Sequence, residues 1–159
     1  MKRTFRTLFV IAIIMMMGTT TGQAAKDRRF IVHHSNETVL DTQTNLMWAA
    51  KDNGSDVNWA NAKSYCENYR AGGYSDWRMP TQDELASLYD ANKTRPAPCY
   101  RSFDIHVTTE SIDITCFAPW ASETRGSDAA QFDFVRGTRF WYLQSHTYGT
   151  RALPVRSAK

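Results

Sequence analysis

The chain has 159 residues, of which 19 are basic and 16 acidic, and its formal net charge is +3. Three of the basic residues, Lys2, Arg3 and Arg6, lie within the first 24 positions, and the rest of the chain carries 16 basic and 16 acidic residues. This balance excludes the broad positive surface with which proteins bind nucleic acid through counterion release, and we expect no nucleic-acid partner.

Residues 1–24 have the organisation of a secretory signal peptide. The basic residues are followed by ten apolar residues, 8–17, and then by Gly22 and Ala24 at the spacing of a cleavage site. A spanning helix needs about 20 apolar residues, so no transmembrane anchor is expected after processing. We therefore expect an exported protein, periplasmic or extracellular, with one mature domain over residues 25–159 and a core at about 30–157.

Three short strands are predicted at the start of the mature chain, at residues 30–33, 38–40 and 46–49. The polar residues between the second and third strands indicate a turn, in which Asn45 is suited to the left-handed conformation.

A helix is predicted next, over residues 58–70. Trp59, Ala62, Cys66 and Tyr69 recur at helical spacing and form one apolar face, and a glycine pair then ends the helix.

A second helix is predicted to begin at Thr81, because Glu84 follows at the spacing of a capping box. The segment 74–80 that joins the two helices is expected to be extended ahead of Pro80.

Several aromatic residues are assigned to the structural core. We interpret Trp77, between Asp76 and Arg78, as a core anchor beside an ion pair. Trp48 and Trp59, in a predicted strand and helix, are likewise expected in the core.

Residues 91–115 lack periodicity and predict a long loop with little regular structure. Four strands are predicted after it, at residues 116–122, 129–135, 138–143 and 150–156. Helices and strands are segregated along the chain, which is typical of an α+β fold.

Three cysteines remain in the mature chain, Cys66, Cys99 and Cys116. Thiols tend to pair in an oxidising compartment, and an odd number leaves one over. A bridge between Cys99 and Cys116 would close a loop of about 18 residues and stabilise the fold by about 3 kcal/mol. The spacing alone leaves the pairing open.

Two parts of the sequence are distinctive: the run GGYSDWRMPT at residues 72–81, and the later segments Trp120-Ala121-Ser122 and Phe132-Asp133-Phe134. With them, the chain from about residue 30 resembles the Lcl C-terminal domain family, long catalogued as a domain of unknown function. The resemblance implies a single C-type-lectin-like domain with two helices packed on short antiparallel strands and a long loop. The family takes its name from the terminal domain of a collagen-like bacterial adhesin that binds sulfated glycosaminoglycans.

The resemblance also bears on the cysteines. Many members carry a cysteine near the position of Leu153, which pairs with the helix cysteine, and this chain lacks it. The resemblance therefore implies that Cys66 is an unpaired core residue and that Cys99 pairs with Cys116.

The candidate ligand-binding residues come from the C-terminal part of the chain and the long loop. Residues 121–159 carry six basic and three acidic residues, a balance suited to sulfate and carboxylate groups, although a solvated sheet surface would have the same composition. Because one of two adjacent strand aromatics must face outward, Trp141 beside Tyr142 is included. The candidates are Arg101, Arg125, Arg136, Arg139 and Trp141.

The sequence contains no nucleophile elbow, paired-histidine zinc motif, phosphate loop or Cys-x-x-Cys motif. We therefore expect no catalysis, no cofactor and no metal. The leading hypothesis is a secreted, non-enzymatic binding module with an adhesive role that recognises a sulfated or acidic polysaccharide or another envelope protein. The alternatives are an enzyme similar to the formylglycine-generating enzymes and a structural component of a cell-surface assembly.

Overall fold

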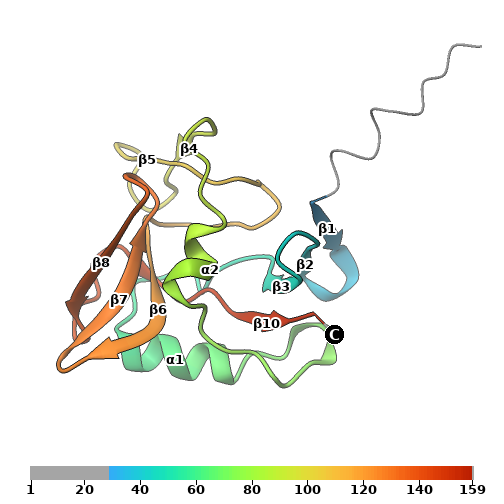
Figure 1. Ribbon diagram of the computed structural model, residues 1–159, viewed down its shortest axis with the longest axis horizontal. Coiled ribbons are helices and arrows are strands. Elements are labelled where there is room, and N and C mark those ends of the chain that lie inside the picture. Colours follow the sequence, from blue (N-terminus) through green and yellow to red (C-terminus); the bar gives the residue numbers. More distant parts are fainter. Residues whose placement is uncertain (1–28, 159) are drawn as a thin grey trace, which may run out of the picture.

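The computed structural model describes residues 29–158, so the predicted signal peptide lies outside the described residues. Two sheets lie at opposite ends of the molecule, with two helices and a long loop between them (Figure 1). Strands predominate, and the predicted α+β class is confirmed.

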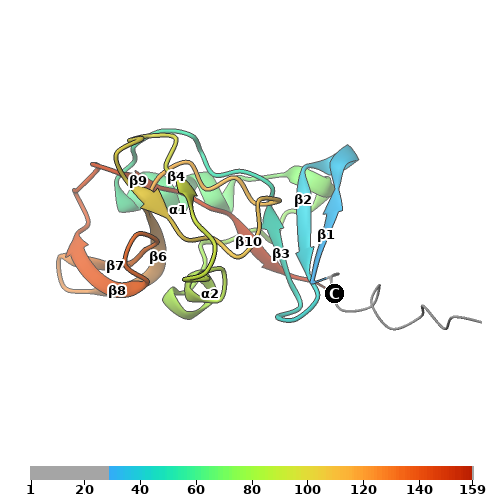
Figure 2. The same ribbon diagram turned by 90° about the horizontal axis from the view of Figure 1, so that it is seen from above.

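The first sheet joins the beginning and the end of the domain. Its order is β1-β2-β3-β10, and all neighbours are antiparallel; Figure 2 shows these strands side by side. A 3-10 turn η1 (His34–Asn36) connects the first two strands, and Asn45 between the next two has the predicted left-handed conformation, with a φ of 55°. The strands are β1 (Phe30–His33), β2 (Thr38–Asp41), β3 (Leu46–Ala49) and β10 (Val155–Ser157).

Helix α1 (Trp59–Glu67) is shorter than predicted. The side-chain amide of Asn68 donates to the carbonyl of Ser64 at 2.8 Å, and the chain then enters the 3-10 turn η2 (Ala71–Gly73). Side-chain bonds of this kind compete with continuation of a helix.

Helix α2 (Gln82–Ala86) starts as the sequence predicts. The hydroxyl of Thr81 accepts from the N–H of Glu84 at 3.1 Å, and the Glu84 carboxylate accepts from the N–H of Thr81 at 2.8 Å. The predicted capping box is therefore confirmed.

The second sheet forms the other end of the molecule, in the order β8-β7-β6-β9. Its three long strands make an antiparallel meander, whereas β9 pairs with β6 in parallel. The strands are β6 (Ala118–Arg125), β7 (Asp128–Asp133), β8 (Thr138–Leu143) and β9 (Thr150–Arg151).

The prediction of one C-terminal strand over residues 150–156 is wrong. The chain pairs with β6 through Thr150 and Arg151, leaves that sheet at Ala152, and pairs with β3 from Val155 onward. Pro154 has no N–H with which to continue a ladder, so the segment divides into two strands of two different sheets. The last residues thereby connect both ends of the molecule.

The long loop at residues 91–115 has little regular structure, as predicted, apart from the short pair β4 (Arg95–Pro96) and β5 (Asp104–Ile105). It is nevertheless packed, because Ile105, Ile112 and Ile114 are fully buried. A disulfide joins Cys99 to Cys116, and Cys66 is a free, buried cysteine, as the resemblance implies.

The expected core aromatics are only partly as predicted. Trp48 and Trp77 are buried, whereas Trp59 is half-buried and donates its indole N–H to the carbonyl of Ala121 at 2.9 Å. The prediction of a single ion pair beside Trp77 is wrong, because Asp76 and Arg78, the two residues that flank Trp77, pair with different partners. Arg78 pairs with Glu84, and Asp76 pairs with Arg156.

Candidate ligand-binding groove

One face of the second sheet is only partly covered: Trp120, opposite Gln131, and Ala129 are buried against α1, and the surface beside them is open. In the register of β7 and β8, Gln131 lies opposite Phe140 and Asp133 lies opposite Thr138. Residues directly opposite each other in an antiparallel pair place their side chains on the same face. These four side chains, together with Tyr142, therefore share one face of the sheet.

A groove of about 450 Å³ lies over this face. Its other side is formed by two loops. One is the disulfide-closed segment with Phe103, followed directly by Phe117, and the other is the connection between β8 and β9 with His146 and Tyr148. The lining residues are Phe103, Phe117, Ala118, Gln131, Asp133, Val135, Arg136, Thr138, Phe140, Tyr142, His146 and Tyr148.

The aromatic side chains of the groove are unusually exposed. Phe103 is 40% exposed, Tyr142 45% and Tyr148 52%, which places all three among the largest exposed apolar residues of the described chain. A rim of stacked rings continues the surface, because the Tyr100 ring lies 5.0 Å from that of Tyr148, and a hydrogen bond with Tyr148 raises the pKa of Tyr100. A contiguous exposed aromatic surface of this kind is typical of a binding site.

The loop that carries Tyr148 is held in place from both sides. Gly149 has a φ of 72° and lies so close to the Phe117 ring that a Cβ would overlap it. Its carbonyl accepts from the N–H of Ala118 at 3.2 Å. The hydroxyl of Thr150 donates to the carbonyls of Val57 and Thr147. The backbone at this side of the groove is therefore fixed rather than free to collapse.

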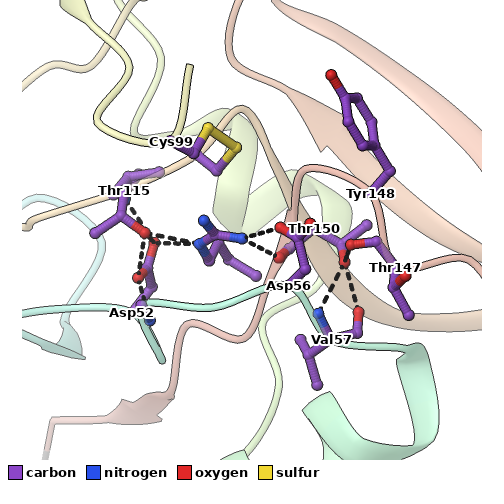
Figure 3. Close-up of a disulfide and its surroundings, with 12 residues drawn as sticks. Asp52, Asp56, Val57, Cys99, Thr115, Thr147, Tyr148 and Thr150 are labelled. Carbon is purple, nitrogen blue, oxygen red and sulfur yellow. Dashed lines mark hydrogen bonds and ion pairs between the residues drawn. A yellow bond between two sulfur atoms is a disulfide. The ribbon is translucent and has the colours of Figure 1, made fainter. Parts of the chain in front are cut away.

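A buried polar cluster beneath the disulfide supports the same region (Figure 3). The guanidinium of Arg151, 5% exposed, donates to Asp56 and, at 2.7 Å, to the hydroxyl of Thr115. Thr115 in turn donates to Asp52 through its N–H and its hydroxyl. Burial raises the pKa of Asp52 despite these bonds and the nearby Arg151. The cluster connects the segment before α1, the disulfide loop and β9.

Asp133 and Arg136 are the charged groups of the groove. The Asp133 carboxylate is largely buried and accepts from the N–H groups of Val135 and Arg136 and from the Arg136 guanidinium at 2.9 Å. The Arg136 side chain is 74% exposed. Because a guanidinium has five donors, Arg136 can hold Asp133 and still bind an anionic ligand group.

The structure divides the candidate ligand-binding residues between surfaces. Arg136 lines the groove, whereas Arg139 lies on the opposite face of β8 and pairs with Asp83 at 2.7 Å. Arg125 lies over the Trp141 ring at 4.5 Å, away from the groove lining. Arg101 is exposed in the disulfide loop and is not among the lining residues. Only one of the five predicted residues therefore belongs to the groove.

Tyr142, rather than Trp141, is the exposed member of the adjacent aromatic pair. Alternation along β8 could have grouped Phe140 with Tyr142 on one face, which is a signal in the sequence. Phe103, Phe117 and Tyr148 carry no comparable signal, because they lie in loops far apart in sequence.

Among residues 29–158 no group of three or more His, Cys, Asp or Glu side chains is arranged to hold a metal ion. Within the same part of the chain, no helix has the length and apolar character needed to span a membrane.

Comparison with protein families identifies a match. The family model described as Lcl C-terminal domain matches residues 37–156, a span that begins directly after η1 and includes the second sheet, the first sheet without β1 and the last residue of β10, both helices and every residue of the groove. No curated protein matches the chain.

Proposed function

The chain belongs to the Lcl C-terminal domain family, and on this premise we propose that it is an exported, non-enzymatic binding module with an adhesive role that holds an anionic polysaccharide in the aromatic groove. The C-type-lectin-like fold implied by the resemblance is part of this proposal.

The groove with its exposed rings is the observation that carries the proposal. Three rings expose apolar surface around the groove: Phe103, Tyr142 and Tyr148. No described part of the chain covers this surface. Sugar rings have apolar C–H faces that pack on aromatic rings, and their hydroxyls remain available to polar side chains such as Thr138.

Arg136 supports an acidic ligand. Its exposed guanidinium lies on the groove, and planar donors of this kind bind sulfate and carboxylate with two parallel hydrogen bonds. The other three candidate arginines lie elsewhere, so we propose recognition of a few acid groups along a stacked sugar chain rather than a broad electrostatic surface.

A thiol-dependent enzyme of the formylglycine-generating type is less favoured. Cys66 is fully buried, burial raises its pKa above the ordinary value, and the other two cysteines form a disulfide. A reactive thiolate requires a lowered pKa and access to solvent.

Heparin chromatography of the mature protein tests the proposal. We expect retention at low salt, earlier elution of Tyr148→Ala because a stacking ring is lost, and earlier elution of Arg136→Ala because a charge contact is lost. Arg139→Ala is the matched control, since it removes the same charge from the opposite face and should elute close to wild type.

Equal losses in the two arginine variants would indicate non-specific charge attraction and would contradict binding in the groove. No retention of the wild type at low salt would overturn the polysaccharide ligand. A pull-down from envelope extract, with Tyr148→Ala as the control, then tests an envelope protein or a cell-surface assembly as the alternative partner.

A further inference from the structure

Gln131 has a buried hydrogen-bond donor without a partner on the floor of the groove. Its side chain is 1% exposed, and its Nε2 atom bonds to no group in the described part of the chain. Its pairing with Trp120 and Phe140 places it between the part of this face that α1 covers and the groove, to whose lining it contributes. Buried donors are nearly always hydrogen-bonded, so such an atom at a binding surface points to an acceptor supplied by a ligand.

Buried polar atoms of Trp48 and His106 in residues 29–158 also lack a partner, but neither residue lines the groove. The backbone of Gln131 is well held, because its carbonyl accepts from the side chain of Gln82 at 2.7 Å. The backbone position of Gln131 is therefore fixed, while its buried side-chain donor is unused in the free protein.

The surroundings of Gln131 favour a neutral acceptor. Asp133 lies two residues further along the same face, about 7 Å away along the strand, and its side chain is only 10% exposed. Arg136 already pairs with this carboxylate, and Gln131 itself brings no positive charge with which to compensate a ligand carboxylate or sulfate. Phe117 and Phe140 supply apolar surface nearby, so an acceptor that carries an apolar substituent fits best.

We infer, on the basis of the proposed function, that Gln131 receives the acetamido group of an N-acetylhexosamine in the polysaccharide. The acetamido carbonyl accepts from Nε2 of Gln131, and the methyl group packs against Phe117 and Phe140. The acid group of a neighbouring sugar binds Arg136 at the edge of the groove. Gln131 is thus a specificity-determining residue. It binds the acetamido group, whereas Arg136 binds the acid group.

Titrations with chitotetraose and cellotetraose test this inference, because these neutral oligosaccharides differ at each ring only in an acetamido group or a hydroxyl. We expect the wild type to bind chitotetraose about tenfold more tightly, the size of one hydrogen bond. Gln131→Leu should abolish the preference, and Tyr148→Ala should weaken both ligands.

The melting temperature of the free variants provides a second measurement. Gln131→Leu, or the unbranched Gln131→Met if leucine fits poorly, removes an unpaired buried donor, so at least one should melt at or above the wild-type temperature while losing the preference. Lower melting temperatures in both variants would show that the amide has a structural role and would overturn the inference.

Equal binding of the two tetrasaccharides, no binding of chitotetraose, or a preference that survives in Gln131→Leu would also overturn the inference. The proposed function is judged separately by heparin retention, which does not depend on Gln131. Retention that depends on Arg136, without any acetamido preference, would leave the proposed function standing and reject only the role of Gln131.

Discussion

Arg136 and Arg139 illustrate what decides the role of a single residue in this protein. Both are exposed arginines that pair with an aspartate, and they lie three positions apart. Arg136 follows the end of β7 and lines the groove, whereas Arg139 lies within β8 and faces α2 through Asp83. Composition predicts that arginines gather in the C-terminal part of the chain, but the face on which each one lies depends on strand register.

Cys66 gives a prediction at the same scale. The thiol lies within a cluster that includes Ala62, Met79 and Trp120, and it is fully buried. We expect native protein to resist a thiol reagent at neutral pH, because burial raises the pKa of Cys66 and excludes the reagent.

The measurement counts the thiols that react before and after denaturation. Denaturant without reductant should release one thiol, and denaturant with reductant should release three. Rapid reaction of Cys66 in the native state, at a rate that denaturant does not change, would show that the thiol is accessible and would contradict its burial.

Local signals define some elements well and fail for others. The capping box of α2 lies within four consecutive residues, so its side-chain partners are visible in the sequence. The division of the last predicted strand is different. The chain leaves the second sheet after Arg151, and Val155 pairs with Trp48, which lies more than 100 positions earlier. An alternating apolar pattern reports that a segment is extended, but not which strand it joins.

Thr81→Ala tests the contribution of the cap to α2. The substitution removes the hydroxyl that accepts from the N–H of Glu84, and the lost cap should lower the free energy of unfolding by about 1 kcal/mol. Urea denaturation measures the change. Thr81→Ser, which keeps the hydroxyl, is the control and should retain most of the stability; an equal loss in both variants would mean that the cap is not the cause.

At the scale of the whole molecule, the disulfide loop and the C-terminal segment hold the two ends together. The loop buries Ile112 and Ile114 in the main core although its sequence shows no period, because an irregular chain can still place apolar side chains inward. The same loop supplies Phe103 to the groove, and its second cysteine is followed directly by Phe117, which also lines the groove. The stability of the fold and the shape of the groove therefore depend on one segment.

Replacing both disulfide cysteines tests this dependence. Cys99→Ser/Cys116→Ser should lower the free energy of unfolding by about 3 kcal/mol, because the bond closes a segment with a sequence separation of 17. Heparin retention should also weaken, since the loop side of the groove is less constrained. Reduced wild-type protein should behave like the double variant, and Cys66→Ser should retain heparin binding.

A double variant that unfolds at the wild-type urea concentration would contradict the stabilising role of the disulfide. Unchanged heparin retention in a destabilised double variant would separate the two effects and place the ligand away from Phe103 and Phe117.

The sequence by itself determined the family, the α+β class, the helix start at Thr81 and the turn at Asn45, because each depends on residues close together in the chain or on a distinctive local run. Only the tertiary structure decided the groove. Its other side comes from two loops distant in sequence, and its floor depends on the register of β7 and β8, which places Gln131 opposite Phe140 and Asp133 opposite Thr138. Contacts between residues distant in sequence leave no local pattern, and for this reason four of the five predicted ligand-binding residues lie outside the groove.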